Sequence, residues 1–83
     1  MKLTFKAPLF KEWSLTDDSI IFGRETIPLS KITKVNYTPN TSKLKNGVVQ
    51  IFVGSDFYTL PFPYKQNDDG DKAAKYILEH YGK

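Results

Sequence analysis

The C-terminal stretch that decides the fold reads Asp69-Gly-Asp-Lys-Ala-Ala-Lys-Tyr-Ile-Leu-Glu-His-Tyr-Gly82. Its apolar side chains recur at the three- and four-residue spacing of one helix face, and they are Ala73, Ala74, Ile77, Leu78 and Tyr81. Asp68 and Asp69 are candidate N-cap residues, and Gly82 is a candidate for the position that ends the helix. Because this is the one convincing helix in the chain, we expect its apolar face to pack on a sheet.

The rest of the chain predicts that sheet. Short runs rich in aromatic and β-branched residues alternate with turn residues, and they cover residues 1–6, 9–15, 19–24, 26–28, 33–37, 48–53 and 57–62. Thr16–Ser19 and Asn46-Gly47 are predicted turns, and Pro61 and Pro63 are expected to end the last strand. Ser30 is expected to cap one helical turn that leaves Leu29 and Ile32 facing inward. Such closely connected strands pair with their sequence neighbours, so the fold is predicted to be mainly β: an antiparallel barrel or split barrel of six to seven strands with one C-terminal α-helix.

Length and composition indicate one small globular domain spanning residues 1–83. Hydrophobic residues make up 40% and aromatic residues 14% of the chain, which argues against disorder. There is no cysteine, so disulfides and thiolate zinc sites are excluded, and a reducing, cytoplasmic location is expected. No run approaches the length of a membrane span, and the first residues lack the apolar run of a signal peptide.

Several segments together resemble a small bacterial pleckstrin-homology-like domain, from a family of unknown function. The resemblance covers roughly residues 13–81, and its most distinctive piece is Ile27-Pro-Leu29 followed by Ile32 and Val35. It implies two antiparallel sheets closed at one end by the C-terminal helix. Eukaryotic relatives that bind phosphoinositides use a basic cluster on the first hairpin. Here the clearest early turn is Thr16–Ser19, whose two aspartates are expected to repel a phosphate headgroup.

Four lysines form the candidate polyanion contact. Lys31, Lys34, Lys43 and Lys45 follow one another with no acidic residue between them, and the chain carries a net charge of +3. Such a group attracts nucleic acid or anionic lipid. The alternative is that these are ordinary solvated side chains, since no arginine accompanies them and arginine is the better bidentate reader of phosphate.

Three aromatic residues form the candidate protein contact: Tyr58, Phe62 and Tyr64. They belong to an aromatic and proline-rich segment, residues 57–64, and Phe57 and Tyr58 are expected to face opposite sides of their strand. With Trp13, these rings could also stack on bases, and the alternative is that they pack in the core. An exposed ring beside the prolines would suit contact with another protein.

The sequence predicts no catalytic centre, cofactor or metal site. His80 is the one histidine, and no nucleophile or carboxylate stands at a useful spacing from it. We therefore expect a non-catalytic interaction or scaffold module with an unidentified protein partner, contacted through a strand edge or residues 57–64, and a homodimer is one form of this. The alternative is polyanion binding through the four lysines. A third hypothesis, a small nucleic-acid-binding barrel, requires exposed aromatic residues beside lysines on one sheet face.

Overall fold

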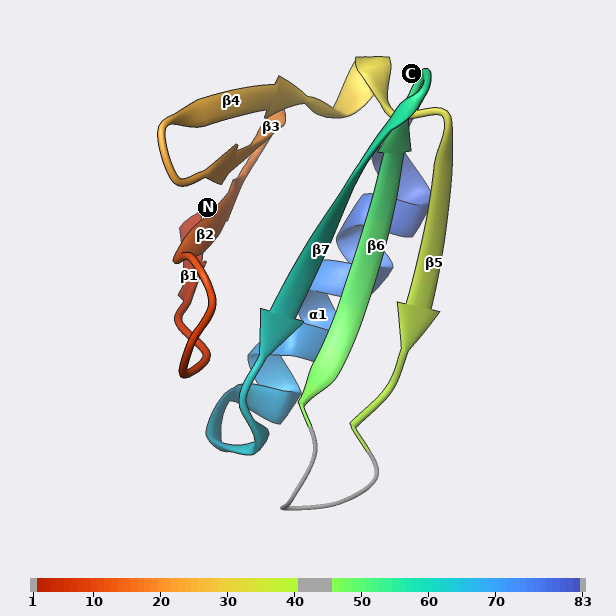
Figure 1. The fold of residues 1–83 in the computed structure, drawn as a ribbon. Coiled ribbons are helices and arrows are strands. Elements are labelled where there is room, and N and C mark those ends of the chain that lie inside the picture. Colours follow the sequence, from red (N-terminus) through yellow and green to blue (C-terminus); the bar gives the residue numbers. More distant parts are fainter. Residues whose placement is uncertain (1, 41–45, 83) are drawn as a thin grey trace.

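The computed structural model describes residues 2–40 and 46–82 and arranges them as two antiparallel sheets and one α-helix (Figure 1). In the first sheet each strand pairs with its sequence neighbour, and the strands are β1 (Lys2–Phe5), β2 (Trp13–Thr16), β3 (Ser19–Phe22) and β4 (Glu25–Pro28). The second sheet follows the same rule, with β5 (Lys34–Thr38), β6 (Gly47–Val53) and β7 (Asp56–Phe62). Seven antiparallel strands with a C-terminal helix confirm the predicted mainly β fold.

The C-terminal helix begins earlier than predicted. Helix α1 (Asn67–His80) follows directly on the 3-10 turn η2 (Tyr64–Gln66), so Asp68 and Asp69 lie inside its first turn and are not N-caps. Their carboxylates still favour the positive end of the helix dipole. Gly82 has a φ of 75° and follows the C-cap residue, as predicted. No helix within residues 2–40 and 46–82 is long and apolar enough to cross a membrane.

The buried face of α1 is narrower than its apolar stripe. Ala73, Ala74 and Ile77 are buried as predicted, whereas Leu78 is 43% exposed and Tyr81 is half-buried. Gly70 is buried instead, one turn before Ala74. Small residues along the contact line let the helix backbone approach the strands closely, and Leu78 then lies outside the contact.

The first hairpin differs most from the prediction. Strand β2 begins at Trp13 and not at Leu9, and residues 6–12 form the loop between β1 and β2. The N–H of Phe10 donates to the carbonyl of Ala7 (3.1 Å), which places Leu9 inside a turn with a φ of 68° and an exposure of 102%. Pro8 cannot donate to a ladder, and the backbone conformation of Leu9 favours glycine. The ladder between β1 and β2 therefore ends at the pair of Phe5 and Trp13.

The acidic turn, residues 17–18, joins β2 to β3 and so belongs to the second hairpin. The first hairpin loop carries Lys6 and Lys11, both exposed. The Nζ of Lys6 donates to the carbonyl of Phe10 and holds the loop closed. The Leu9 side chain is fully exposed at the tip of this loop.

The chain passes from the first sheet to the second through a short 3-10 turn, η1 (Leu29–Lys31). Leu29 and Ile32 are buried as predicted, but Pro28 and not Ser30 occupies the N-cap position, without a side-chain cap. The N–H of Leu29 donates to the carbonyl of Asp18, and the N–H of Gly82 donates to the carbonyl of Leu29, both at 2.9 Å. This crossing is thus fixed both to the first sheet and to the end of α1.

Phe62 is the side chain on which the helix and the second sheet meet. A Cβ added to Gly47 would lie 2.2 Å from its Cζ, and one added to Gly70 would lie 2.4 Å from its Cδ2. Gly47 is directly opposite Phe62 in the ladder between β6 and β7. The predicted turn at Asn46-Gly47 was therefore wrong in part, because Gly47 begins β6 and is needed there for its missing side chain.

Trp13 joins the two sheets. Its ring is 1% exposed and stacks on Phe5 with centroids 4.5 Å apart, and its Nε1 donates to the carbonyl of Pro61 at 2.7 Å. Pro61 lies inside β7 and does not end it, contrary to the prediction. Its carbonyl points to Trp13 at the outer edge of the sheet, so the missing N–H of proline removes no ladder hydrogen bond.

A charged group ties the helix to β5. The hydroxyl of Tyr37 donates to Asp71 Oδ1 (3.0 Å), and Lys75 Nζ lies 2.9 Å from Asp71 Oδ2. Burial, and then the hydrogen bond to Asp71, raise the pKa of Tyr37 to about 12. The hydrogen bonds from Lys75 and then Tyr37 hold the pKa of Asp71 below its ordinary value.

Replacing Gly70 with alanine is expected to destabilise the protein. Helix propensity alone would favour alanine by about 1 kcal/mol. The clash with Phe62 opposes this, and overpacking of a core typically costs about 1–3 kcal/mol. Chemical denaturation of G70A, with K72A as an exposed control on the same helix, measures the sign. A more stable G70A would contradict the packing described above, and F62L in the same chain should recover part of the loss.

Removing the Asp71 carboxylate is expected to change how stability depends on pH. Because the folded pKa of Asp71 is lowered, its contribution is present above its unfolded pKa of about 4 and is lost as the pH falls through the folded value. The difference in unfolding free energy between the wild type and D71N should therefore shrink below about pH 4. Denaturant midpoints at neutral and acidic pH test this, with D69N as the matched control. An unchanged difference at low pH would contradict the assignment.

Candidate functional site

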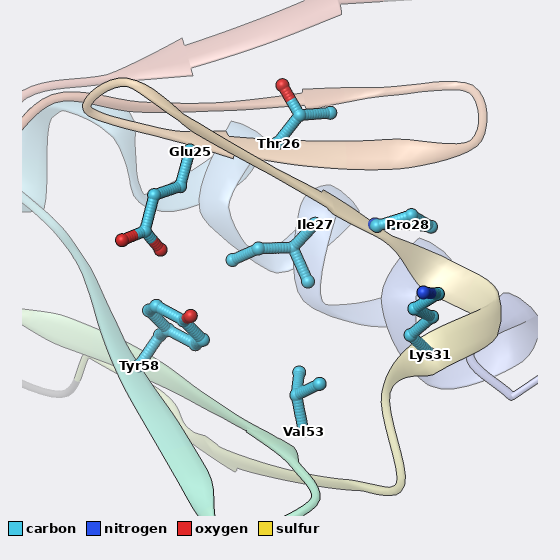
Figure 2. A pocket seen from close by; sticks show the side chains of 7 residues that line it. All are labelled: Glu25, Thr26, Ile27, Pro28, Lys31, Val53 and Tyr58. Atoms are coloured by element: carbon cyan, nitrogen blue, oxygen red, sulfur yellow. The ribbon is translucent and has the colours of Figure 1, made fainter.

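An open cleft lies where the two sheets separate. It has a volume of about 370 Å³ and is lined by residues of β4, of η1 and of the hairpin formed by β6 and β7; these residues are Glu25, Thr26, Ile27, Pro28, Lys31, Val53 and Tyr58 (Figure 2). Strand β4 is the last strand of the first sheet and β7 the last of the second, and the two are not paired. We call this space the edge cleft, because one wall is an edge strand.

Side-chain contacts join the first sheet to β7 beside the edge cleft. Phe22 of β3 and Tyr58 of β7 meet edge to face, with centroids 5.6 Å apart and planes at 69°. Farther along β7, the bond from Trp13 to Pro61 closes the gap. The space between these contacts and η1 is left open, so the outer edge of β4 borders it.

Glu25 and Tyr58 form the polar end of the edge cleft. Glu25 occupies the same cross-strand row as the inward-facing Trp13 and Phe22, so the register brings its side chain toward the second sheet. Figure 2 shows its carboxylate directed toward the Tyr58 ring. The hydrogen bond to Glu25 is the largest cause that raises the pKa of Tyr58 above its ordinary value. The phenol is therefore a donor at neutral pH, and the carboxylate keeps acceptor capacity for a ligand.

The rest of the edge cleft is apolar until it reaches a lysine. Ile27 forms the floor, and Val53 faces it from the end of β6 (Figure 2). Lys31, exposed in the last turn of η1, lines the far end. A negative group on β4, an apolar middle and a positive group on η1 thus follow one another along the edge cleft, an arrangement that can orient an extended ligand.

Two residues of the predicted polyanion contact, Lys31 and Lys34, belong to the described part of the chain. Lys31 lines the edge cleft, whereas the Nζ of Lys34 lies over the ring of Phe52, 5.5 Å from its centroid. Phe52 alternates with the core residue Ile51, so Lys34 and Phe52 face away from the core. Lys43 and Lys45 lie outside the described residues. Lys31 thus belongs to the edge cleft, and Lys34 belongs to the outward side of the second sheet.

The three residues of the predicted protein contact also have different environments. Tyr58 lines the edge cleft, and Tyr64, at the start of η2, is 43% exposed. Phe62 is fully buried, so its assignment to a contact surface was wrong: its ring fills the space between Gly47 and Gly70. The most exposed ring of residues 57–64 is that of Phe57, at 61%.

Sequence reasoning missed Glu25, which it treated as a turn residue. The signal that was available is its alternation with Ile27, because an acidic residue two positions before a core residue shares its face of the strand. The partner of Glu25 on β7 is 33 positions away in the chain, and no local pattern connects them.

His80 lies away from the edge cleft, at the end of α1. Its ring stacks on Tyr76 with centroids 4.0 Å apart, and its Nδ1 bonds to the Tyr76 carbonyl (2.8 Å). His80 lines a second hollow, together with Ser30 and Asp18. The Tyr76 carbonyl orients its ring, whereas a carboxylate orients the histidine of a catalytic triad. Within the described ranges, no group of three or more His, Cys, Asp or Glu side chains could hold a metal ion.

Comparisons with known protein families, with curated proteins and with solved structures found no match. The chain is thus described by its geometry: a small domain of two antiparallel sheets with a C-terminal helix and an open edge cleft between the sheets.

Substituting glutamine for Glu25 should lower the pKa of Tyr58 toward its ordinary value, since the largest cause of its rise is removed. A pH titration of the Tyr58 ring carbons by NMR measures this. E12Q is the matched control, because Glu12 is an exposed glutamate that does not line the edge cleft. A Tyr58 titration that is the same in E25Q and in wild type would show that the two side chains do not interact in solution.

Proposed function

We propose that this domain is a non-catalytic interaction module that binds an extended segment of another polypeptide in the edge cleft. The observation that carries the proposal is an edge strand, β4, that borders an open cleft with opposite charges at its two ends. An extended segment laid along β4 gains main-chain hydrogen bonds, and its alternate side chains enter the cleft. The edge of a strand is a ready template for such pairing.

The lining of the edge cleft supports a particular chemistry for that segment. The Glu25 carboxylate favours a lysine or arginine side chain, and Lys31 favours an acidic side chain or a terminal carboxylate about one strand-length away. Ile27 and Val53 favour an apolar side chain between them. This assignment uses one residue of each predicted set, Tyr58 and Lys31.

The order of the elements supports placing this domain among the pleckstrin-homology-like domains. Four strands in one sheet, three in the other and a C-terminal helix agree with the arrangement that the sequence resemblance implies. In this proposal the fold positions the residues of the binding surface. The ligand is inferred from those residues, because a fold alone does not assign one. A second copy of the chain is one polypeptide that could supply the segment, so the oligomeric state belongs in the test.

Selection of peptides from a random displayed library on the immobilised domain tests the proposal. We expect selected peptides to carry a basic residue and to shift the amide signals of residues 25–27, 31, 53 and 58. E25K should weaken their binding by about fivefold or more, the factor that corresponds to about 1 kcal/mol for an exposed charge pair. E79K, which reverses an exposed charge on α1, is the matched control.

Two results would overturn this function. The first is a set of selected peptides whose amide shifts fall outside the edge cleft. The second is equal loss of affinity in E25K and E79K, which would indicate that only net charge matters. Sedimentation of the free domain at increasing concentration shows whether a second copy competes for the same segment.

A further inference from the structure

The outward face of the second sheet carries an unusual row of side chains. The register pairs Lys34 with Phe52 and Phe52 with Phe57, so a lysine and two phenylalanines cross the three strands side by side. The next row along the strands, on the same face of the sheet, consists of Asn36, Gln50 and Thr59. We call these two rows the outer face. Outward positions of a sheet are normally polar, and the first row departs from this.

The described residues leave the outer face uncovered. The helix and the first sheet contact side chains of the opposite face: Gly70 packs on Phe62, Asp71 bonds to Tyr37, and Phe22 meets Tyr58. Figure 1 shows α1 behind β5, β6 and β7, with no ribbon in front of them. The two rows are exposed or half-buried along their whole length.

The aromatic pair presents a flat apolar surface next to a cation. Phe57 is 61% exposed, and its ring lies 6.1 Å from that of Phe52, at 32° between the planes. The Nζ of Lys34 lies 5.5 Å from the centroid of Phe52. Amide and hydroxyl groups of the second row supply both donors and acceptors at hydrogen-bonding reach of anything that stacks on the rings.

We propose that the outer face binds single-stranded nucleic acid. Bases stack on Phe57 and Phe52, the polar edges of the bases meet Asn36, Gln50 and Thr59, and a phosphate pairs with Lys34. Stacking on aromatic side chains of a sheet and charge neutralisation by lysine are the two components of single-strand binding. The net charge of +3 agrees with an anionic ligand. This surface is separate from the edge cleft, so the inference does not depend on the proposed function.

A short oligothymidylate is the first probe, added to the labelled domain while its amide signals are followed. The expected shifts fall on residues 34, 36, 50, 52, 57 and 59. F57A should weaken binding at least about tenfold, because stacking of one base contributes about 1–3 kcal/mol. F10A is the matched control: Phe10 is 45% exposed on the loop between β1 and β2, away from this face, and its removal should leave the affinity unchanged.

Lys34 and the bases are tested separately. K34A should weaken binding. It should also reduce the slope of log affinity against log salt concentration by about 0.7, the value for one phosphate contact in a single strand. K2A should leave this slope unchanged. An abasic strand of the same length should bind at least about tenfold more weakly than the oligothymidylate. E25Q, in the edge cleft, should bind the oligothymidylate like the wild type.

Three outcomes would overturn the inference. They are amide shifts confined to residues outside the outer face, equal affinities of F57A and F10A, and equal binding of the abasic strand. A retained native amide spectrum in each variant excludes unfolding as the cause of a loss. Peptides selected on the domain that compete with the oligothymidylate for Phe57 would show that the outer face is a protein contact instead.

Discussion

The close fit of one phenylalanine ring between two glycines is the constraint on which this structure depends. Phe62 lies at the end of β7, Gly47 at the start of β6 and Gly70 in the first half of α1. Because neither glycine has room for a methyl group, the helix backbone and the strand backbone both approach the ring directly. Phe5 lies 6.1 Å from the same ring, so the first sheet joins the contact. One side chain thus positions three layers of the fold, which explains why a chain of this size holds together with a narrow helix face.

Local patterns predicted the elements because each pattern has a local cause. Alternation along residues 48–53 and 57–62 follows from a sheet with one buried face, and the spacing of Ala73, Ala74 and Ile77 follows from helix geometry. The helix start was wrong because the turn of residues 64–66 runs directly into α1 and removes the need for an aspartate cap. The second strand was wrong because Leu9 adopts a backbone conformation that its side chain disfavours. Neither cause is visible in the residue types alone.

The surfaces were harder to predict than the elements because they combine residues distant in the chain. Glu25 and Tyr58 meet only when the first sheet folds over the second. Phe62 is buried because Gly47 and Gly70 leave space for its ring. Lys31 and Lys34 are three positions apart, yet Lys31 lines the edge cleft and Lys34 lies over the ring of Phe52. The sequence was enough to say that a nucleic-acid-binding barrel requires exposed aromatic residues beside lysines on one sheet face. The fulfilment of this requirement by Lys34, Phe52 and Phe57 needed the register of β5, β6 and β7.

The split between the sheets links the packing to both surfaces. If β4 and β7 were paired, the two sheets would merge at this side, and neither the edge of β4 nor the polar end formed by Glu25 and Tyr58 would be accessible. The Trp13 indole instead closes the gap at one place with a single hydrogen bond to β7. That contact and the Phe62 packing fix the second sheet without the side chains of Phe52 and Phe57, which lie on its outward side. Aromatic side chains placed there are free of the core, and this is the physical reason that Phe57 can be exposed while its neighbour Tyr58 closes the cleft.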